Sequence, residues 1–192
     1  MSSTKRTSMT SAPIIDLSTI RITALPPERS LGNFECGEDE IDRNLEKCNT
    51  RNRTHRARIF YAWSKIEDKI LGFYCLAISA SESKYLDEYF KRDDDFRPYI
   101  PFIYLSYIGV QREYQCQKIG TILMMDCLTK CERVARITGT YGVSLNALTD
   151  RLRKGYEKYG FRQFGDTRFP FMVLPTQALF DLVGKGFAPP PA

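Results

Sequence analysis

Hydrophobic residues are most densely grouped between Phe102 and Val134, and this stretch organises the predicted fold. It opens with an apolar and aromatic run, Phe102 to Val110, that only Ser106 and Gly109 interrupt. The run is too short to span a membrane and is rich in Ile, Tyr and Phe. It therefore predicts a strand buried on both faces.

A polar turn, residues 111–118, separates this strand from an amphipathic helix. Apolar side chains then recur at three- and four-residue spacing, which predicts one buried helix face: Ile119, Leu123, Cys127, Cys131 and Val134. The opposite face carries Asp126, Lys130, Glu132 and Arg133. A buried strand, a tight turn and a helix N-terminus direct backbone N–H groups at one point, so we expect an anionic cofactor to bind there.

The rest of the chain alternates between strand-like and helix-like patterns. Ile20 to Leu25 alternates apolar and polar residues and ends at two prolines, as a first strand would. Two β-rich runs around a polar turn predict a hairpin. We expect strands at 20–25, 59–63, 70–78, 102–110, 141–147, 161–164 and 169–174, and helices at 38–53, 119–134, 150–159 and 176–183. A long polar connection, 79–101, is expected to hold a short helix around 85–90.

This order of elements predicts an α/β fold, a mixed α+β sheet covered on both faces. At 192 residues the chain is long enough for a single domain with a substantial core. We place the domain at 18–184, between a Ser/Thr-rich, disordered tail at 1–17 and a Pro-rich, flexible tail at 185–192. The N-terminal residues have no apolar centre, so we expect neither a signal peptide nor a membrane anchor.

The cysteines and the single histidine limit the kinds of catalytic and metal site that the chain could have. The chain has 6 cysteines but no Cys-x-x-Cys pair, which favours reduced, mostly buried thiols and a cytoplasmic protein over disulfides or zinc. His55 is the only histidine, and it lies in an arginine-rich run where imidazole is a poor base. The sequence therefore argues against serine or cysteine hydrolase chemistry, and we expect no metal site.

The net charge of +5 is unevenly distributed. Basic residues dominate 41–58, where Arg43, Lys47 and Arg51 recur at four-residue spacing along one outward helix face. Such a stripe suits an anionic partner. A solvated helix face has the same pattern, so both interpretations stay open.

Two motifs indicate more specifically what the predicted anion-binding turn could bind. The turn reads QCQKIG at 115–120, which is neither a Gly-x-Gly-x-x-Gly run nor a P-loop. Downstream, the strand-like YGVSLNA at 141–147 precedes GYEKYGF at 155–161. Together these resemble the GNAT family of acyl-CoA-dependent N-acetyltransferases. The cofactor turn of that family reads Arg or Gln, two residues, Gly, one residue, Gly or Ala, and its fold ends in a segment like Phe-Tyr-Glu-Lys-Phe-Gly-Phe.

The resemblance is closer to one branch of that family. FECGEDEI at 34–41, the Arg-rich helix after it, LGFY at 71–74 and the closing segment 169–182 are similar to the tRNA-acetylating GNAT toxins of bacterial type II toxin–antitoxin modules. The similarity spans about Leu31 to Leu182, with its motifs in the family's order. Cys116 and Lys118 depart from the pattern, because the family usually has glycine there. Ser106-Tyr107 stand where those toxins tend to carry Gly-Arg.

The resemblance implies the GNAT fold in a single domain and acetyl-CoA as the cofactor. The turn would offer backbone N–H groups to the CoA pyrophosphate, and the adjoining strand would hold the pantetheine arm. The implied cofactor-binding residues are Ile108, Gly109, Val110, Gln115, Cys116, Gln117, Lys118, Ile119, Gly120 and Thr121. Tyr156 would protonate the departing thiolate, and Asn146 would bind pantetheine or orient a water. The sequence shows no strong side-chain base, so the amine would arrive neutral, as an aminoacyl ester amine can.

These implications lead to a functional hypothesis. We predict that the protein acetylates the amino acid on an aminoacyl-tRNA as a translation-blocking toxin. A ribbon–helix–helix antitoxin and a homodimer are the implied partners, without membrane association. The implied tRNA-binding residues are Arg43, Lys47, Arg51, Arg53, Arg151, Arg153 and Lys154.

Several alternatives remain open from the sequence. The acceptor could be a small-molecule or protein amine, or the chain could be a weakly active or non-catalytic binding protein with the same fold. At the level of residues, Tyr156 could simply pack under the sheet, Asn146 could cap its strand, and the basic stripe could be a solvated face.

Overall fold

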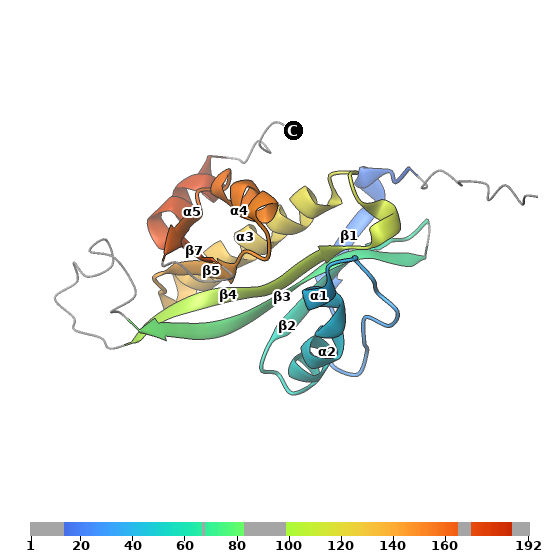
Figure 1. Ribbon diagram of the computed structural model, residues 1–192, viewed down its shortest axis with the longest axis horizontal. Coiled ribbons are helices and arrows are strands. Elements are labelled where there is room, and N and C mark those ends of the chain that lie inside the picture. The colour runs from blue at the N-terminus through green and yellow to red at the C-terminus, as the bar shows by residue number, and fades with distance from the viewer. Residues whose placement is uncertain (1–13, 67, 83–98, 165–169, 186–192) are drawn as a thin grey trace, which may run out of the picture.

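One mixed sheet forms the centre of the molecule, as the sequence predicts (Figure 1). The computed structural model describes residues 14–66, 68–82, 99–164 and 170–185. The strands are β1 (Ile20–Ala24), β2 (Arg58–Ser64), β3 (Lys69–Glu82), β4 (Tyr99–Val110), β5 (Gly142–Asn146), β6 (Arg162–Phe164) and β7 (Phe171–Pro175). They lie in the order β1-β2-β3-β4-β5-β7-β6, and only the β4–β5 pair is parallel.

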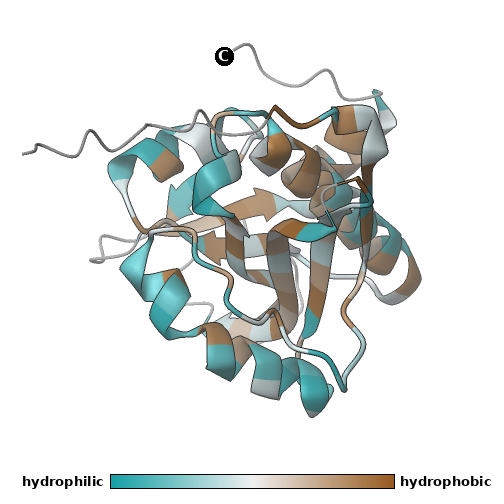
Figure 2. Ribbon diagram, turned by 90° about the vertical axis from the view of Figure 1, so that its right-hand side faces the viewer, coloured by the Kyte–Doolittle hydropathy of each residue, from teal (hydrophilic) through white to brown (hydrophobic). Residues whose placement is uncertain are grey.

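Helices cover both faces of this sheet. They are α1 (Asp39–Arg43), α2 (Leu45–Arg53), α3 (Ile119–Thr138), α4 (Asp150–Glu157) and α5 (Thr176–Gly184), with short 3-10 helices η1 (Leu17–Thr19) and η3 (Arg112–Tyr114). α1 and α2 lie on one side, and α3, α4 and α5 on the other (Figure 1). Strands are largely apolar, whereas the outward turns of the helices are hydrophilic (Figure 2). No helix in the described residues is long and apolar enough to cross a membrane.

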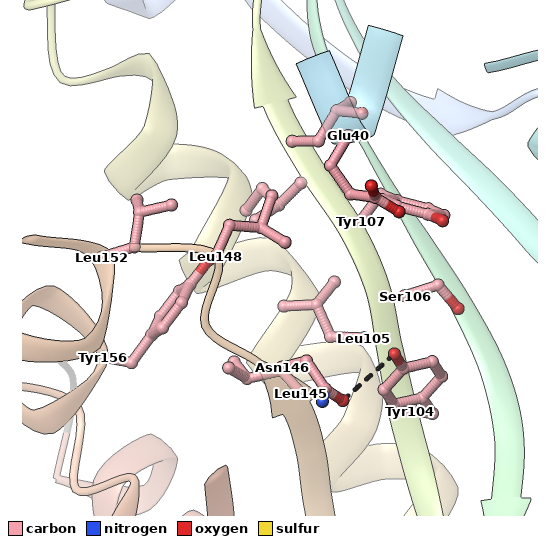
Figure 3. A pocket seen from close by; sticks show the side chains of 12 residues that line it. Glu40, Tyr104, Leu105, Ser106, Tyr107, Leu145, Asn146, Leu148, Leu152 and Tyr156 are labelled. Atoms are coloured by element: carbon pink, nitrogen blue, oxygen red, sulfur yellow. Dashed lines mark hydrogen bonds between the residues drawn. The ribbon is translucent and has the colours of Figure 1, made fainter. Parts of the chain in front are cut away.

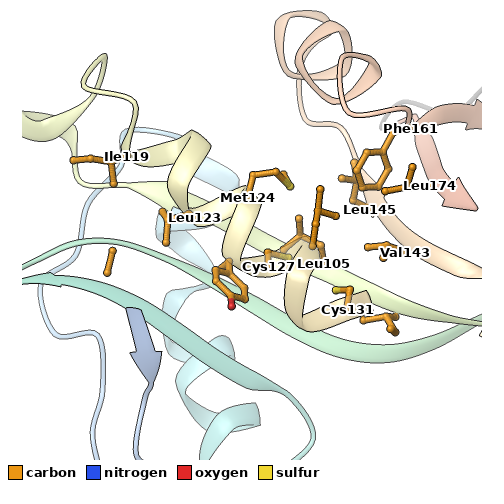
Figure 4. Packing of buried hydrophobic residues seen from close by; sticks show 14 of the residues in the cluster. Leu105, Ile119, Leu123, Met124, Cys127, Cys131, Val143, Leu145, Phe161 and Leu174 are labelled. Carbon is orange, nitrogen blue, oxygen red and sulfur yellow. The ribbon is translucent and has the colours of Figure 1, made fainter. Parts of the chain in front are cut away.

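The two faces have separate hydrophobic cores. On the α1–α2 side, Ile41 and Cys48 pack in a cluster with Phe73 and Cys75 of β3. On the other side, α3 buries Ile119, Leu123, Met124, Cys127, Leu128, Cys131 and Ala135, and Figure 4 shows this face against β4, β5 and β7. Each large apolar side chain buried here contributes about 1.5–3 kcal/mol.

The predicted α3 face needs one correction. Val134 is 37% exposed, and Ala135 takes its place in the core. Asp126 does not point freely into solvent either. It accepts a hydrogen bond from the Tyr74 hydroxyl at 2.5 Å and pairs with Lys130.

The helix predicted at 38–53 is two helices, because Asn44 interrupts it with φ −97° and ψ 7°. The Asn44 side-chain amide donates to the carbonyl oxygen of Glu40 at 2.7 Å and to its Oε1 at 3.0 Å. Asparagine competes with the helix backbone for hydrogen bonds in this way, which is why it often marks a helix break.

The boundaries of the predicted connection and tail also change. β3 runs to Glu82 and β4 starts at Tyr99, so both ends of the 79–101 connection are strand. The short helix expected around 85–90 lies outside the described residues. The tail was expected to reach residue 17, yet Ile15 is only 6% exposed and its N–H donates to Gln117 Oε1 at 2.9 Å.

Candidate active site

The site lies where β4 and β5 separate. The two strands pair only at Ile103 with Val143 and at Tyr104 with Ser144. β4 then continues to Val110 without β5 beside it. Its backbone groups on that edge are therefore open to a ligand that adds like an extra strand. For the same reason, the predicted burial of this strand on both faces is wrong for its carboxyl-terminal half, which is partly exposed.

A β-bulge in β4 sets the direction of the side chains here. Cys75 lies opposite Tyr107, but the next residue of β3 lies opposite Leu105, so Ser106 is the extra residue. The bulge places Tyr104 and Tyr107 on the same face of the sheet, toward α1 and α2. The Ser106 hydroxyl is buried without a hydrogen-bond partner among the described residues.

A cleft of about 590 Å³ follows the open edge of β4 to the N-terminus of α3. Of the predicted cofactor-binding residues, all except Gln117 line it. The Gln117 side chain instead holds the N-terminal segment through Ile15. The structure thus brings nine of the ten predicted cofactor residues together around one cleft.

The turn into α3 has the backbone shape that glycine favours, although no glycine is present at the two key positions. Cys116 has φ 62° and Lys118, the N-cap of α3, has φ 63°, both in the left-handed region. This conformation costs a non-glycine residue roughly 1–2 kcal/mol. The departure from the family motif therefore lies in residue type, and the turn still points the first N–H groups of α3 at the cleft.

Gln115 has a role that its sequence position did not reveal. Its Nε2 donates to the carbonyl oxygens of Cys36 at 2.7 Å and Val110 at 3.2 Å, which ties the turn to the FECG motif. Asp42 in turn accepts hydrogen bonds from the backbone N–H groups of Cys36 at 2.9 Å and Gly37 at 2.8 Å. Cys36 and Gly37, which line the cleft, are thus held in place.

Tyr156 lies at the junction of this cleft with a second cavity of about 230 Å³. Its hydroxyl has no hydrogen-bond partner in the described part of the chain, whereas the neighbouring Tyr159 is hydrogen-bonded to Thr121. Burial raises the pKa of Tyr156 well above the ordinary tyrosine value. A phenol that keeps its proton and faces a cavity can serve as a general acid.

The second cavity lies in the gap between β4 and β5, with α1 and α4 beside it (Figure 3). Asn146 lines this cavity, and its Oδ1 accepts a hydrogen bond from the Tyr104 hydroxyl at 3.3 Å. Asn146 does not line the larger cleft. Desolvation raises the pKa of Tyr107, on the same wall, to about 12.

The predicted tRNA-binding residues fall into two groups on either side of the cavities. α1 and α2 carry Arg43, Lys47, Arg51 and Arg53, and α4 carries Arg151, Arg153 and Lys154. They are not equally available to a polyanion. Arg153 is held by Asp150 at 3.3 Å and Glu157 at 2.5 Å, whereas Arg151 lines the larger cleft.

Several cavity residues were not identified from the sequence. The larger cleft also includes Arg112, Glu38 and Tyr159, and the smaller cavity includes Glu40, Tyr104 and Tyr107. Glu40 lies within the FECGEDEI motif, so the motif itself was a usable signal. In the sequence Tyr107 is only a departure from the Gly-Arg of the related toxins, and Tyr104 gives no signal. Their common orientation depends on the bulge.

Known proteins support this assignment of the fold. Residues 90–170 match the family model described as acetyltransferase (GNAT) domain. The tRNA-acetylating toxin of Mycobacterium tuberculosis (strain ATCC 25618 / H37Rv) is 25% identical over 129 residues, covering 67% of this chain and 76% of the toxin.

Two solved structures share the architecture. AtaT complexed with acetyl-methionyl-tRNAfMet has a TM-score of 0.73 at 21% identity, covering 85% of this chain and 99% of AtaT. A mutant AtaT toxin bound to the C-terminus of the antitoxin AtaR and acetyl-CoA has a TM-score of 0.69 at 19% identity, covering 86% and 98%. With the matched segment and the cleft geometry, these similarities show that the chain has the GNAT acetyltransferase fold.

Proposed function

We propose that this protein transfers the acetyl group of acetyl-CoA to the amino acid of an aminoacyl-tRNA, as the translation-blocking toxin of a toxin–antitoxin pair. The observation that carries the proposal is that the left-handed turn at Cys116 and Lys118 opens on the same cleft as Tyr156. A phosphate-binding turn and a proton donor on one cleft are what acyl transfer from CoA requires. The tRNA-acetylating relative and the tRNA-bound AtaT support the choice of acceptor.

The residues of the cleft fit the chemical parts of acetyl-CoA. When bound, this cofactor supplies an acetyl group activated as a thioester. The N–H groups of Ile119, Gly120 and Thr121 in the first turn of α3 would bind its pyrophosphate, assisted by the helix dipole. The open edge of β4 at Ile108 to Val110 would hold the pantetheine arm through backbone hydrogen bonds.

Tyr156 would supply the proton that the reaction needs. Acetyl transfer replaces the C–S bond of the thioester by a C–N bond, so the departing sulfur needs a proton, and the Tyr156 hydroxyl would donate it. The proton that the amine loses would restore Tyr156 through solvent. General acid catalysis of this kind contributes roughly 10²–10⁴-fold.

The acceptor stem of tRNA would contact both basic groups beside the cavities. Arg43, Lys47, Arg51 and Arg53 would contact phosphates from the α1–α2 side, and Arg151 and Lys154 from the α4 side. We do not include Arg153 as a phosphate contact, because two carboxylates already hold it.

The proposal includes partners. A ribbon–helix–helix antitoxin would neutralise the toxin, and the protein would form a homodimer. The AtaT structure with its antitoxin supports an antitoxin partner. Since aminoacyl-tRNA is used in the cytoplasm, the proposed action takes place there.

The test is incubation of the protein with labelled acetyl-CoA and total charged tRNA. We expect label in the tRNA fraction, attached to the amino acid, and no label with uncharged tRNA. The Tyr156→Phe variant should transfer far less. If label enters only proteins or small amines, the tRNA proposal is wrong and one of the alternative acceptors is the substrate.

A further inference from the structure

The smaller cavity has been assigned no ligand of its own above, yet a carboxyl group lines it. It is lined mainly by leucine, isoleucine and tyrosine, and Glu40 is the only acidic or basic side chain among its lining residues. Apolar walls around a few convergent polar groups are typical of a site for a small ligand. A carboxylate in such surroundings favours a cation as its partner.

We infer that this cavity receives the amino end of the acceptor, and that the Glu40 carboxylate binds the acceptor amine in its ammonium form before the amine gives up a proton to solvent and reacts. The inference rests on the proposed function and specifies how the same site recognises its acceptor. It assigns Glu40 as a substrate-binding residue.

The position of the cavity supports this role. It shares Ile41, Ile108, Leu152 and Tyr156 with the larger cleft, so the two spaces meet at the proposed general acid. Figure 3 shows Glu40 and Tyr107 on one side of the cavity and Tyr156 across from them. An amine entering from the side of Glu40 would therefore approach the reacting atoms opposite the cofactor cleft.

The carboxylate is held in place but is not neutralised. Its Oε1 accepts one hydrogen bond, from Asn44 Nδ2 at 3.0 Å. Among the described residues no cation forms an ion pair with Glu40. The break between α1 and α2 at Asn44 thus has a consequence for the site, because it orients Glu40 while leaving its charge for a ligand.

The cavity also offers oxygen acceptors besides Glu40. Tyr107 and Asn146 both line it. An ammonium group has three N–H donors, so it could bond to Glu40 and still have donors for these oxygens. The half-buried Glu40 carboxylate, which has no ion pair in the described residues, therefore carries the inference.

The experiment compares two small acceptor probes in the absence of acetyl-CoA. One is amide-linked alanyl-adenosine, and the other is its lactyl counterpart, in which a hydroxyl replaces the amine. We expect the full chain to bind the alanyl probe about tenfold more tightly in calorimetry, because a hydrogen bond between charged groups is stronger than one to a hydroxyl. Glu40→Gln should reduce the ratio of the two affinities to about one without changing the affinity for the lactyl probe.

Asp39→Asn is the matched control, because Asp39 precedes Glu40 on α1 but lines neither cavity. It removes the same charge and should keep the tenfold ratio. Thermal denaturation of both variants shows whether they fold. Equal or absent binding of the two probes by the unaltered chain, or an unchanged ratio in Glu40→Gln, overturns the inference. Transfer of label to tRNA in the assay above would still support the proposed function in that case.

Discussion

The side-chain Nε2 of Gln115 lies 2.7 Å from the carbonyl oxygen of Cys36, across 79 positions of sequence. This hydrogen bond connects the turn before α3 to the part of the cleft wall that Cys36 and Gly37 form. The sequence gives both segments a place in the family resemblance but does not show that one holds the other. Gln115 therefore acts by positioning the cleft.

Replacing Gln115 by alanine should loosen the turn. We expect the Kd for acetyl-CoA to rise about fivefold to tenfold, since each lost hydrogen bond contributes about 0.5–1.5 kcal/mol. Calorimetry measures this directly. Gln117→Ala is the matched control, because its side chain does not line the cleft, and it should leave the Kd unchanged. Equal effects of both substitutions would contradict the positioning role.

Lys118→Gly should stabilise the protein, because glycine adopts a φ of 63° without strain. The gain is about 0.5–1 kcal/mol after the larger entropy loss of glycine on folding is included. Urea denaturation gives the free energy of unfolding. Lys118→Ala removes the same charge but keeps the strained φ, so it should give no such gain. If alanine stabilises as much as glycine, the strain is not the cause.

Tyr156→Phe should lower kcat about 10²-fold or more, because it removes the proposed proton donor. The affinity for acetyl-CoA should stay nearly unchanged, since the backbone and the α3 N-terminus bind the cofactor. Single-turnover kinetics with charged tRNA measure the first effect and calorimetry the second. Tyr159→Phe is the comparison, because the Tyr159 hydroxyl is already bonded to Thr121. A larger loss in Tyr159→Phe would reverse the assignment.

The rate should not fall with pH in the range where an ordinary tyrosine ionises. Burial raises the pKa of Tyr156, so its neutral, proton-donating form persists above the ordinary tyrosine pKa of about 10. We expect the single-turnover rate at a saturating concentration of the amine acceptor to stay constant as the pH is raised to 10. Circular dichroism must show that the fold persists over the same range. A decline with a midpoint below 10 in a folded protein would exclude Tyr156 as the acid.

Arg151 and Arg153 offer a test of the tRNA interface within one helix. Both lie on α4, but only Arg153 is held by two carboxylates. Arg151→Gln should weaken tRNA binding and reduce its salt dependence by about one unit of slope. Arg153→Gln should change neither appreciably. The binding is measured over a salt series without acetyl-CoA, because Arg151 also lines the cofactor cleft. An affinity insensitive to salt would contradict the tRNA proposal.

The sequence predicts the elements well because their hydrophobic periods are regular. α3 and β5 are found close to their expected positions, and the mixed sheet has the predicted order of elements. Local irregularities escaped prediction for a physical reason. The break at Asn44 and the bulge at Ser106 depend on single hydrogen bonds and on the register against a distant strand.

The same reason explains which parts of the candidate site could be predicted from the sequence and which could not. The turn at 115–120 could be predicted because a contiguous motif encodes it. Glu40, Tyr104 and Tyr107 share a cavity only because the bulge and the helix break orient them. Arg153 is predicted as a phosphate contact from its charge, and its ion pairs with Asp150 and Glu157 could not be predicted from that charge.

The short pairing of β4 with β5 also has a mechanical consequence. In the described residues β4 and β5 pair at only two positions, and one further backbone hydrogen bond, from the Tyr141 N–H to the Pro101 carbonyl oxygen, joins the two halves of the sheet. A molecule seated in the gap touches both halves, so binding should stiffen the whole domain as well as fill a site. Hydrogen exchange would then slow on binding in β7, which lines neither cavity, as well as along Leu105 to Val110, and the unliganded protein would be most flexible at its own active centre.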